Sequence, residues 1–329
     1  MTRHIPFNCQ SRVWGHFKAS HATSPPAIHL NIGSKPNRLE EEKATLIRSL
    51  KNMVRVLSLL VLGWMGAVYV QAAGAGQESL SLEGPMVQGG LVQGTTVPGA
   101  KVWVDGRKVR VSPQGMFLVG FGRDASQRVK LAITYPNGKK EHRVLSIKKR
   151  KYKIQRINGL PPRKVNPHKR DLARIQEDAR LAKAARMLDA PRTDFEDGFI
   201  WPVMGKITGV YGSQRILNGE PRRPHFGVDI AEAIGTPVKA PAGGVITLAH
   251  PNMFFSGATL ILDHGHGLSS TFLHLNKILV KKGDRIAQGD FIAELGKSGR
   301  ATGPHLDWRM NLFTQRIDPQ LLVSPMSAN

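Results

Sequence analysis

The last part of the chain is cut by glycine and proline into short segments, and this punctuation constrains its fold more than any other feature. From Phe199 to Val323 no stretch keeps the 3.6-residue hydrophobic periodicity of a helix. Segments such as GTPVKAPAGGVITLAH, GATLILDHGHGLSSTFLHL and VKKGDRIAQGDFIAEL are typical of successive strands and hairpins. Short turns between strands imply antiparallel pairing. The sequence therefore predicts an all-β domain, an antiparallel sheet or sandwich, over residues 194–325.

Residues 82–148 show a second run of short alternating strands. Val102 and Val104 share one face, Asp105-Gly106 forms a tight turn, and Asn137-Gly138 marks another hairpin. The pattern predicts a small β-sandwich that resembles the Ig-like modules of bacterial exported proteins. Nothing in it is arranged for chemistry, so we interpret it as a spacer or docking module.

Residues 149–193 are predicted to form a basic linker that contains an amphipathic helix. The stretch KRDLARIQEDARLAKAARMLDA places Leu172, Ile175 and Leu188 among charged residues and alanines and ends before Pro191. The simplest interpretation of its charges is a solvated face. A coiled-coil role is the alternative, but the stretch is short for one.

A targeting segment lies at residues 53–75, an unusual distance from the first residue. Basic residues precede the apolar run VLSLLVLGWMGAVYV, and Ala73-Gly74-Ala75 offers small residues for cleavage. The run is short for a membrane span, which needs about 20 apolar residues, although an uncleaved anchor is the alternative. Residues 1–52 lack periodicity, and we interpret them as non-structured or as the product of a mis-assigned start, with translation beginning at Met53. The remainder is predicted to be exported, to the periplasm or cell envelope.

The chain is strongly basic, which bears on its partners. It holds 47 Lys and Arg against 24 Asp and Glu, a formal net charge of +23, and residues 139–170 contain thirteen Lys or Arg with one acid, Glu141. This charge indicates polyanionic surroundings. No zinc-finger spacing or aromatic RNA-binding pattern accompanies it, so nucleic acid is not the predicted partner. We expect anionic envelope polymers to be attracted to the basic linker.

Histidine and aspartate supply the candidate chemistry, because Cys9 is the only cysteine. His225 and Asp229 would share one face of an extended segment, with Gly227 between them leaving room for a metal. His305 and Asp307 share a face in GPHLDWR, and His274 lies in the alternating stretch STFLHL. Each pair alone is a weak signal. Together they are the donor set that a cysteine-free zinc site needs.

Four blocks in this region resemble a known family, the lysostaphin/LytM-type zinc metallopeptidases that cut peptides of bacterial cell-wall peptidoglycan. The resemblance covers about the last 130 residues. The blocks follow the family's order and spacing: WPVMGKITGVYG, HFGVDIAEAIGTPVKAPAGGVI, HGLSSTFLHL and VKKGDRIAQGDFIAELGKSGRATGPHLDW. The resemblance implies a duplicated-hybrid-motif-like fold, one Zn²⁺ per chain, and peptidoglycan as the substrate.

The resemblance also implies residue roles. It assigns His225 and Asp229 as metal ligands, and His274 and His305 as catalytic histidines. The family's third ligand, a histidine, falls on Asp307. Aspartate is a legitimate zinc ligand, but a second carboxylate makes the metal a weaker Lewis acid. We therefore expect slower hydrolysis or a more alkaline optimum, and tolerance of metals such as Mn²⁺.

Two other functions remain open at the level of sequence. The loss of the third histidine favours a non-catalytic LytM-like protein that binds the wall or activates a cell-wall amidase, whereas retention of the other four residues favours the enzyme. The residue pattern of VKKGDRIAQGDFIAEL also resembles that of lipoyl- or biotinyl-carrier domains. Those domains carry a modified lysine at a hairpin tip, and no Met-Lys or Asp-Lys tip is present here. Tyr211 and Arg215 are candidates for the substrate groove, with packing and surface roles as the alternatives. His250, His264 and His266 have no predicted role.

Overall fold

The computed structural model describes residues 42, 43, 45–50 and 80–326. The described residues before position 51 are helical. The predicted signal peptide at 53–75 lies outside the described residues, as does most of the segment 1–52. Among the helices that are described, none has the length and apolar character required to cross a membrane. Residues 1–73 and 74–329 form separate units, and all the described strands belong to the second.

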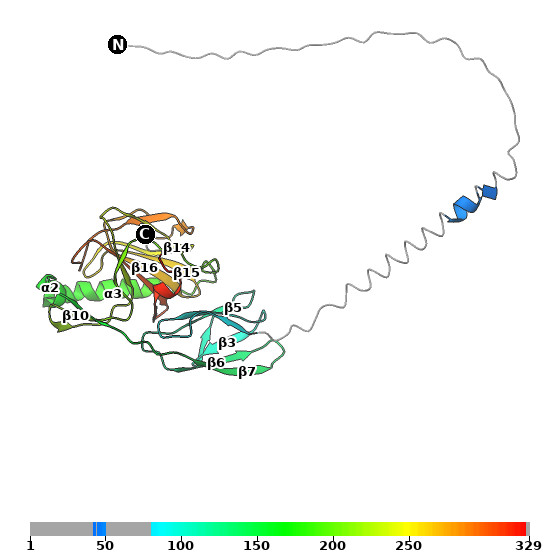
Figure 1. Cartoon of the computed structure of the whole chain (residues 1–329), viewed down its shortest axis with the longest axis horizontal. Coiled ribbons are helices and arrows are strands. Elements are labelled where there is room, and N and C mark those ends of the chain that lie inside the picture. The colour runs from blue at the N-terminus through cyan, green and yellow to red at the C-terminus, as the bar shows by residue number, and fades with distance from the viewer. Residues whose placement is uncertain (1–41, 44, 51–79, 327–329) are drawn as a thin grey trace, which may run out of the picture. The chain divides into compact units, whose positions relative to one another are not determined.

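The N-terminal part of this second unit is a sandwich of two antiparallel sheets (Figure 1). One sheet has the order β1-β2-β5 and the other β4-β3-β6-β7. The strands are β1 Ser81–Glu83, β2 Leu91–Thr95, β3 Lys101–Val104, β4 Arg107–Val109, β5 Met116–Gly120, β6 Arg128–Thr134 and β7 Lys140–Ser146. Val92, Val102, Phe117 and Leu131 are among the residues of its buried core. The Ig-like assignment stays a prediction.

The tight turns of this sandwich lie where the sequence predicts them. Asp105 and Gly106 join β3 to β4 and both have positive φ, 47° and 78°. Gly138, with φ 85°, turns β6 into β7. At the first turn, positive φ at both central positions matches the right-handed twist of the flanking strands, which is why Asp-Gly is favoured there.

The basic segment after the sandwich is not a free linker. It forms β8 (Ile154–Ile157), α2 (Pro162–Val165), the 3₁₀ turn η1 (Lys169–Asp171) and α3 (Leu172–Arg186). β8 pairs in parallel with β10 (Gln214–Leu217), which also pairs with β11 (Glu220–Pro221). The segment predicted as a basic linker with a helix thus also contributes a paired strand. A small apolar cluster of Leu160, Val165 and Leu217, hidden among basic residues, anchors the segment.

The helix in this segment packs on the C-terminal domain, and of the three predicted apolar residues only Ile175 is partly buried. α3 contacts β14 and β15, while Leu172 and Leu188 are each 47% exposed. Ala185 is buried instead, and Leu188 lies beyond the end of the helix. Phe254 N–H donates to Asp178 Oδ2 at 2.6 Å, so polar contacts as well as apolar ones hold the helix in place. The three apolar residues of the predicted helix were therefore not sufficient to identify its buried side.

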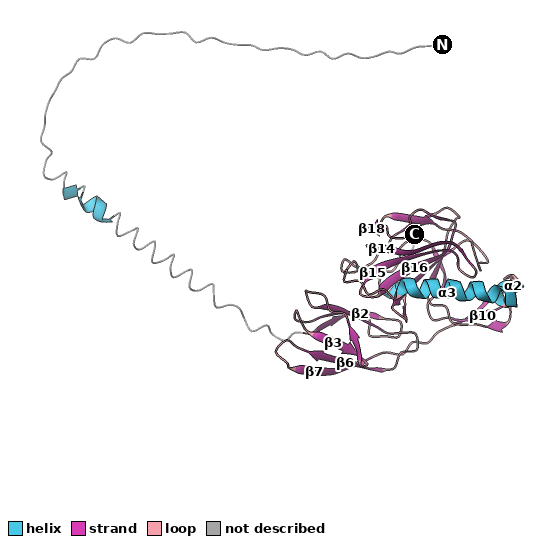
Figure 2. Cartoon of the chain, turned by 180° about the vertical axis from the view of Figure 1, so that it is seen from behind, coloured by secondary structure: helices cyan, strands magenta, loops and turns pink. Residues whose placement is uncertain are grey.

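The C-terminal domain is built on an eight-stranded antiparallel sheet, and strands dominate its secondary structure (Figure 2). The order is β18-β14-β15-β16-β20-β12-β9, with β21 on β20, and a second antiparallel sheet has the order β13-β19-β17. The strands of the first sheet are β9 Lys206–Gly209, β12 Val228–Ala231, β14 Gly244–Met253, β15 Gly257–Gly265, β16 Leu268–Leu275, β18 Arg285–Ile286, β20 Leu306–Leu312 and β21 Gln315–Ile317; those of the second are β13 Pro237–Lys239, β17 Lys277–Ile278 and β19 Phe291–Glu294, and a 3₁₀ turn, η2, spans Pro319–Leu321. The predicted all-β, antiparallel class is confirmed.

Strand alternation gives the large sheet an apolar face and a polar face. Val228 and Ile230 of β12, with Leu306 and Trp308 of β20, belong to the main buried core. The intervening residues of the same strands point to the opposite face because side chains alternate with a period of two. Asp307 is one of them. The core thereby fixes which side chains reach the polar face.

His264, on β15, is buried in a chain of hydrogen bonds. Its Nδ1 lies 2.6 Å from Gly243 O and its Nε2 lies 2.8 Å from Ser270 Oγ, which also accepts from Trp308 Nε1 at 3.3 Å. Donation from Nδ1 to the carbonyl leaves Nε2 as an acceptor, so the neutral ring satisfies the chain. Burial lowers the pKa of His264 to about 4.

This histidine predicts a pH dependence of stability. Between about pH 6.5 and 4 the unfolded chain binds the proton that folded His264 excludes, so stability falls as the pH is lowered through that window, by up to about 3 kcal/mol. In urea unfolding at pH 7, 5.5 and 4, His264→Gln should be less stable than wild type at pH 7 and should lose less stability on acidification. His250→Gln, at a partly exposed position of β14, is the control. Equal pH slopes in wild type and His264→Gln would contradict this assignment.

Candidate metal centre and active site

Two carboxylates face each other across neighbouring strands. Asp229 on β12 and Asp307 on β20 are direct partners in the antiparallel register, and they are 5% and 0% exposed. Carboxylates directly opposite one another on a sheet repel. Such a buried pair requires positive charge close by.

His225 lies just before β12 and completes a group of three possible metal ligands. Its Nε2 is 3.0 Å from Asp229 Oδ1, and its Nδ1 is 4.0 Å from Asp307 Oδ2. One ligand atom from each of the three residues can be chosen so that all lie within 4.8 Å of one another. Both ring nitrogens of His225 and Asp229 Oδ1 are buried without a hydrogen-bond partner. Three buried candidate ligands, two of which carry unsatisfied atoms, fit a bound divalent metal.

An arginine is paired with each carboxylate. Arg309 donates to both oxygens of Asp307, from Nε to Oδ1 at 2.8 Å and from Nη2 to Oδ2 at 2.5 Å. Arg215 of β10 donates from Nη2 to Asp229 Oδ2. Burial opposes ionisation of both acids, but His225 and Arg215 hold the pKa of Asp229 at about 2, and Arg309 and His225 hold that of Asp307 well below its usual value. Both carboxylates are therefore ionised and available as ligands.

Two glycines leave space for these carboxylates. A Cβ on Gly209 of β9 would lie 2.2 Å from Asp229 Oδ2. A Cβ on Gly227 would lie 2.7 Å from Asp307 Oδ1 and 2.6 Å from Arg309 Cγ. Real Cβ atoms do not approach so closely, so any larger residue would displace the acids. The expectation that Gly227 keeps the site clear agrees with this geometry.

His274 reaches the polar face through a β-bulge. Simple alternation would place it on the same side as Phe272, which is in the core, but the pairing of β15 with β16 shifts register between Ala258 and Leu260. His274 takes up the extra residue with a positive φ of 64°. Bulges of this kind re-aim side chains and are enriched beside active sites. The prediction that His274 alternates regularly with its neighbours is therefore wrong, although its side chain does reach the pocket.

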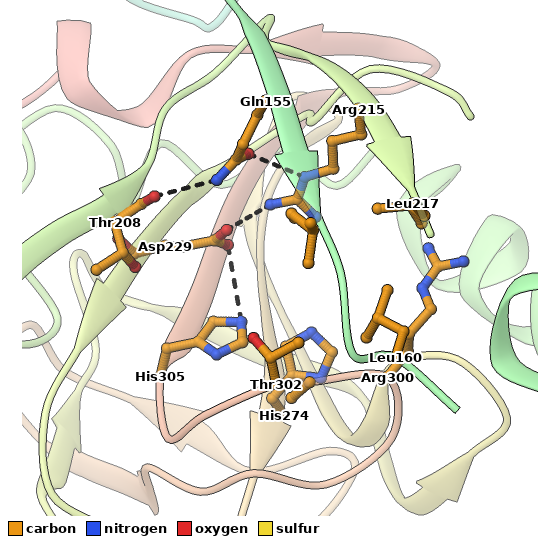
Figure 3. A pocket seen from close by; sticks show the side chains of 12 residues that line it. Gln155, Leu160, Thr208, Arg215, Leu217, Asp229, His274, Arg300, Thr302 and His305 are labelled. Carbon is orange, nitrogen blue, oxygen red and sulfur yellow. Dashed lines mark hydrogen bonds and ion pairs between the residues drawn. The ribbon is translucent and has the colours of Figure 1, made fainter. Parts of the chain in front are cut away.

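His274 and His305 stand next to each other at the pocket (Figure 3). Their ring centroids are 4.8 Å apart. Nδ1 of His274 lies 2.8 Å from Ser298 O, and Nδ1 of His305 lies 2.9 Å from Gly303 O, so each Nδ1 donates and each Nε2 is left for the pocket. His305 Nε2 is 4.0 Å from Asp229 Oδ1. Burial, followed by the neighbouring His305, lowers the pKa of His274 to about 4, so this ring is neutral near pH 7.

The pocket brings together predicted residues and residues that the sequence did not indicate. Asp229, His274 and His305 line it, as does Arg215, which was a candidate for the groove. Tyr211 is buried instead, and its hydroxyl donates to Arg316 O at 2.7 Å, so it packs rather than lines the groove. Residues that sequence analysis missed are Gln155, Leu160, Arg300 and, beside Asp307, Arg309. His264 and His266 do not line this pocket.

Comparison with known proteins places this site in a recognised domain. Residues 223–319 match Peptidase family M23. The chain is 35% identical over 123 residues to the peptidoglycan DD-endopeptidase ShyA of Vibrio cholerae, which covers 34% of this chain and 28% of that protein. It is 34% identical over 103 residues to the DD-carboxypeptidase/endopeptidase Mpg of Neisseria meningitidis, covering 31% and 24%. The match thus spans about a quarter of the length of these curated relatives.

A solved structure resembles more of the chain than the family match covers. It is a protein from Pseudomonas aeruginosa assigned to peptidase M23, with 29% identity and a TM-score of 0.56. The likeness covers 72% of this chain and 94% of that one. Because residues 223–319 are a smaller share of the chain, the similarity extends beyond the peptidase domain.

The pairing of Arg309 with Asp307 predicts that the stability of an Arg309 variant depends on bound metal more than that of wild type does. Removing one partner of a buried ion pair costs about 3–5 kcal/mol, so Arg309→Met should destabilise the metal-free protein by that amount. Added zinc should then raise the melting temperature of this variant more than that of wild type. Arg180→Met, which breaks an exposed pair with Glu177 on α3, should cost under about 1 kcal/mol. A metal-free Arg309→Met as stable as wild type would contradict the pairing.

The clearance at Gly209 predicts a loss of metal affinity. Gly209→Ala pushes the Asp229 carboxylate out of position, and disturbing a ligand's support typically lowers affinity about 10- to 100-fold. Competition with a chelating dye measures the effect. Gly303→Ala is the control, because a Cβ there meets nothing within 4 Å. Equal zinc affinity in the two variants would count against Asp229 as a ligand.

Proposed function

Because the C-terminal region is a domain of Peptidase family M23, we propose that this chain is a zinc-dependent endopeptidase that hydrolyses peptide bonds in bacterial peptidoglycan. One observation carries the proposal. The three candidate ligands, His225, Asp229 and Asp307, form one cluster, and Asp229 also lines the pocket that holds the two histidines, His274 and His305. A fold that merely binds the wall has no need for this convergence.

The proposed zinc would be held by His225, Asp229 and Asp307. Three protein ligands leave a position for water, as in catalytic zinc sites, and the buried, unpartnered atoms of His225 and Asp229 support this assignment. When bound, the metal polarises the scissile carbonyl and lowers the pKa of a coordinated water. Tolerance of Mn²⁺ stays a prediction.

The two histidines have complementary roles in this proposal. With Nδ1 held by Ser298 O, neutral His274 offers the lone pair of Nε2 to orient a water and accept its proton. His305, fixed by Gly303 O, presents its Nε2 beside Asp229, where it can stabilise the negative charge of the tetrahedral intermediate or pass a proton to the leaving amine. The carbonyl partners fix each tautomer before the substrate arrives.

The proposed substrate and location rest on relatives and on charge. ShyA is named a peptidoglycan DD-endopeptidase, and Mpg is named a DD-carboxypeptidase/endopeptidase. These names support a cell-wall peptide as the substrate. Such a substrate implies a place in the periplasm or envelope, in line with the predicted signal peptide. The net charge of +23 supports a salt-dependent attraction to anionic envelope polymers.

A second candidate function has an observation of its own. Arg309 occupies both oxygens of Asp307, so the acid is neutralised without a metal. A metal-free domain held together in this way would bind the wall or activate a cell-wall amidase rather than hydrolyse peptides. Metal content and digestion distinguish the two.

The test combines metal analysis with digestion of isolated peptidoglycan. Purified wild type should hold about one zinc per chain and release peptides whose masses show a hydrolysed amide, whereas His225→Ala should hold little zinc and release none. Asp307→His should raise zinc affinity if position 307 is a ligand. His250→Ala controls for loss of a histidine outside the pocket. A wild-type protein without metal and without product would favour the binding protein.

A further inference from the structure

Arg300 lies in the loop between β19 and β20 and lines the same pocket as the candidate catalytic residues. Its backbone N–H donates to Phe255 O at 2.7 Å, which fixes the position of the loop. Figure 3 shows its side chain beside Leu160 and Leu217, while Asp229, His274 and His305 line the rest of the pocket. The residue therefore contacts whatever fills this pocket.

The guanidinium of Arg300 has no carboxylate partner among the described residues. Nη1 donates to Lys164 O at 3.3 Å, and Cζ lies 4.8 Å from the centre of the Phe255 ring. These contacts leave most of its five N–H groups free. Arg215, in the same pocket, is instead paired with Asp229. Of the two arginines that line the pocket, Arg300 is thus the one whose charge is not already paired with a carboxylate of the described residues.

The charges around Arg300 are mostly positive. Burial, followed by the neighbouring Arg215, Arg309 and Arg222, lowers its pKa to about 10, and only Asp307 acts in the opposite direction. At neutral pH the group remains charged. A largely buried cation among other cations is stabilised strongly by an incoming anion, because the surrounding protein screens less than water does.

We propose that Arg300 is a specificity residue that binds a free carboxylate of the peptide substrate next to the scissile bond. This inference rests on the proposed function and names a feature of its substrate. Since Phe255 covers one face of the guanidinium, recognition uses the free edge, and two parallel N–H groups match the two oxygens of a carboxylate. Leu160 and Leu217 shield the contact from water.

The carboxylate could belong to the C-terminus of the peptide or to an acidic side chain. Both sources present the same chemistry to Arg300, so separate amidation of each distinguishes them. The probes are soluble cross-linked peptides cut from peptidoglycan and synthetic copies in which either the terminal or the side-chain carboxylate is a carboxamide. The full chain loaded with zinc is used throughout, and both kcat/KM and Kd are measured.

Wild type should favour the free acid over one of the two amides by about 10- to 100-fold in kcat/KM, as expected for a charge-assisted bidentate contact. Arg300→Gln should bring that ratio close to one. Arg300→Lys keeps the positive charge but lacks the two parallel N–H groups of a guanidinium, so it should retain part of the preference for the free acid. Arg174→Gln is the matched control, because Arg174 also lies over a phenylalanine, Phe254, at 5.8 Å but does not line the pocket, and it should keep the full preference.

The outcomes separate this inference from the proposed hydrolysis. If peptides are cleaved but acid and amides react equally, the carboxylate site is wrong and the peptidase stands. If no peptide is cleaved yet the acid binds more tightly than one amide, and Arg300→Gln removes the difference, the site stands without hydrolysis. If Arg300→Gln still prefers the free acid over the amide, another residue binds the carboxylate and the inference is overturned.

Discussion

The direct pairing of Asp229 with Asp307 across β12 and β20 is the constraint on which the rest of the site depends. Two buried, ionised acids repel across a strand pair, and the sheet holds them together because Val228, Ile230, Leu306 and Trp308 bury the other face of the same strands. A slip of one residue would move the acids into the core, so the packing that stabilises the domain also fixes its carboxylates.

The arginines change the expected effect of an aspartate at the candidate third ligand position, residue 307. Taken alone, a second carboxylate would make a bound zinc less electrophilic than one held by two histidines and an aspartate. Arg309 and Arg215 each bring a positive charge to one acid, so the two carboxylates and two guanidinium groups are neutral overall before any metal binds. Groups that hydrogen-bond to metal ligands tune their donor strength. If Asp307 is a ligand, the expected penalty of the second aspartate is therefore offset by Arg309 on β20 and Arg215 on β10.

Alternation and glycine punctuation were sufficient to predict the antiparallel class and the side on which His225, Asp229 and Asp307 lie, because both depend on local geometry. The bulge at His274 could not be predicted, since it arises from the pairing of β15 with β16. Arg309 had a detectable signal, as it lies two residues after Asp307 on one strand and shares its face. Arg300 had none, because its place in the pocket depends on the fold of a loop.

The basic segment before the peptidase domain contributes residues to the site, although its charged composition alone indicates only a linker. Gln155 of β8 donates to Thr208 O at 3.1 Å and accepts from Arg215 Nε at 3.4 Å, and Arg215 in turn holds Asp229. Leu160 supplies part of the apolar wall beside Arg300. A domain cut at residue 194, where the predicted all-β domain begins, would therefore lose one wall of the pocket and the support of Arg215. The structural unit that supports this site begins no later than β8, because Gln155, within the basic segment, shares one network of hydrogen bonds with Arg215 and Asp229.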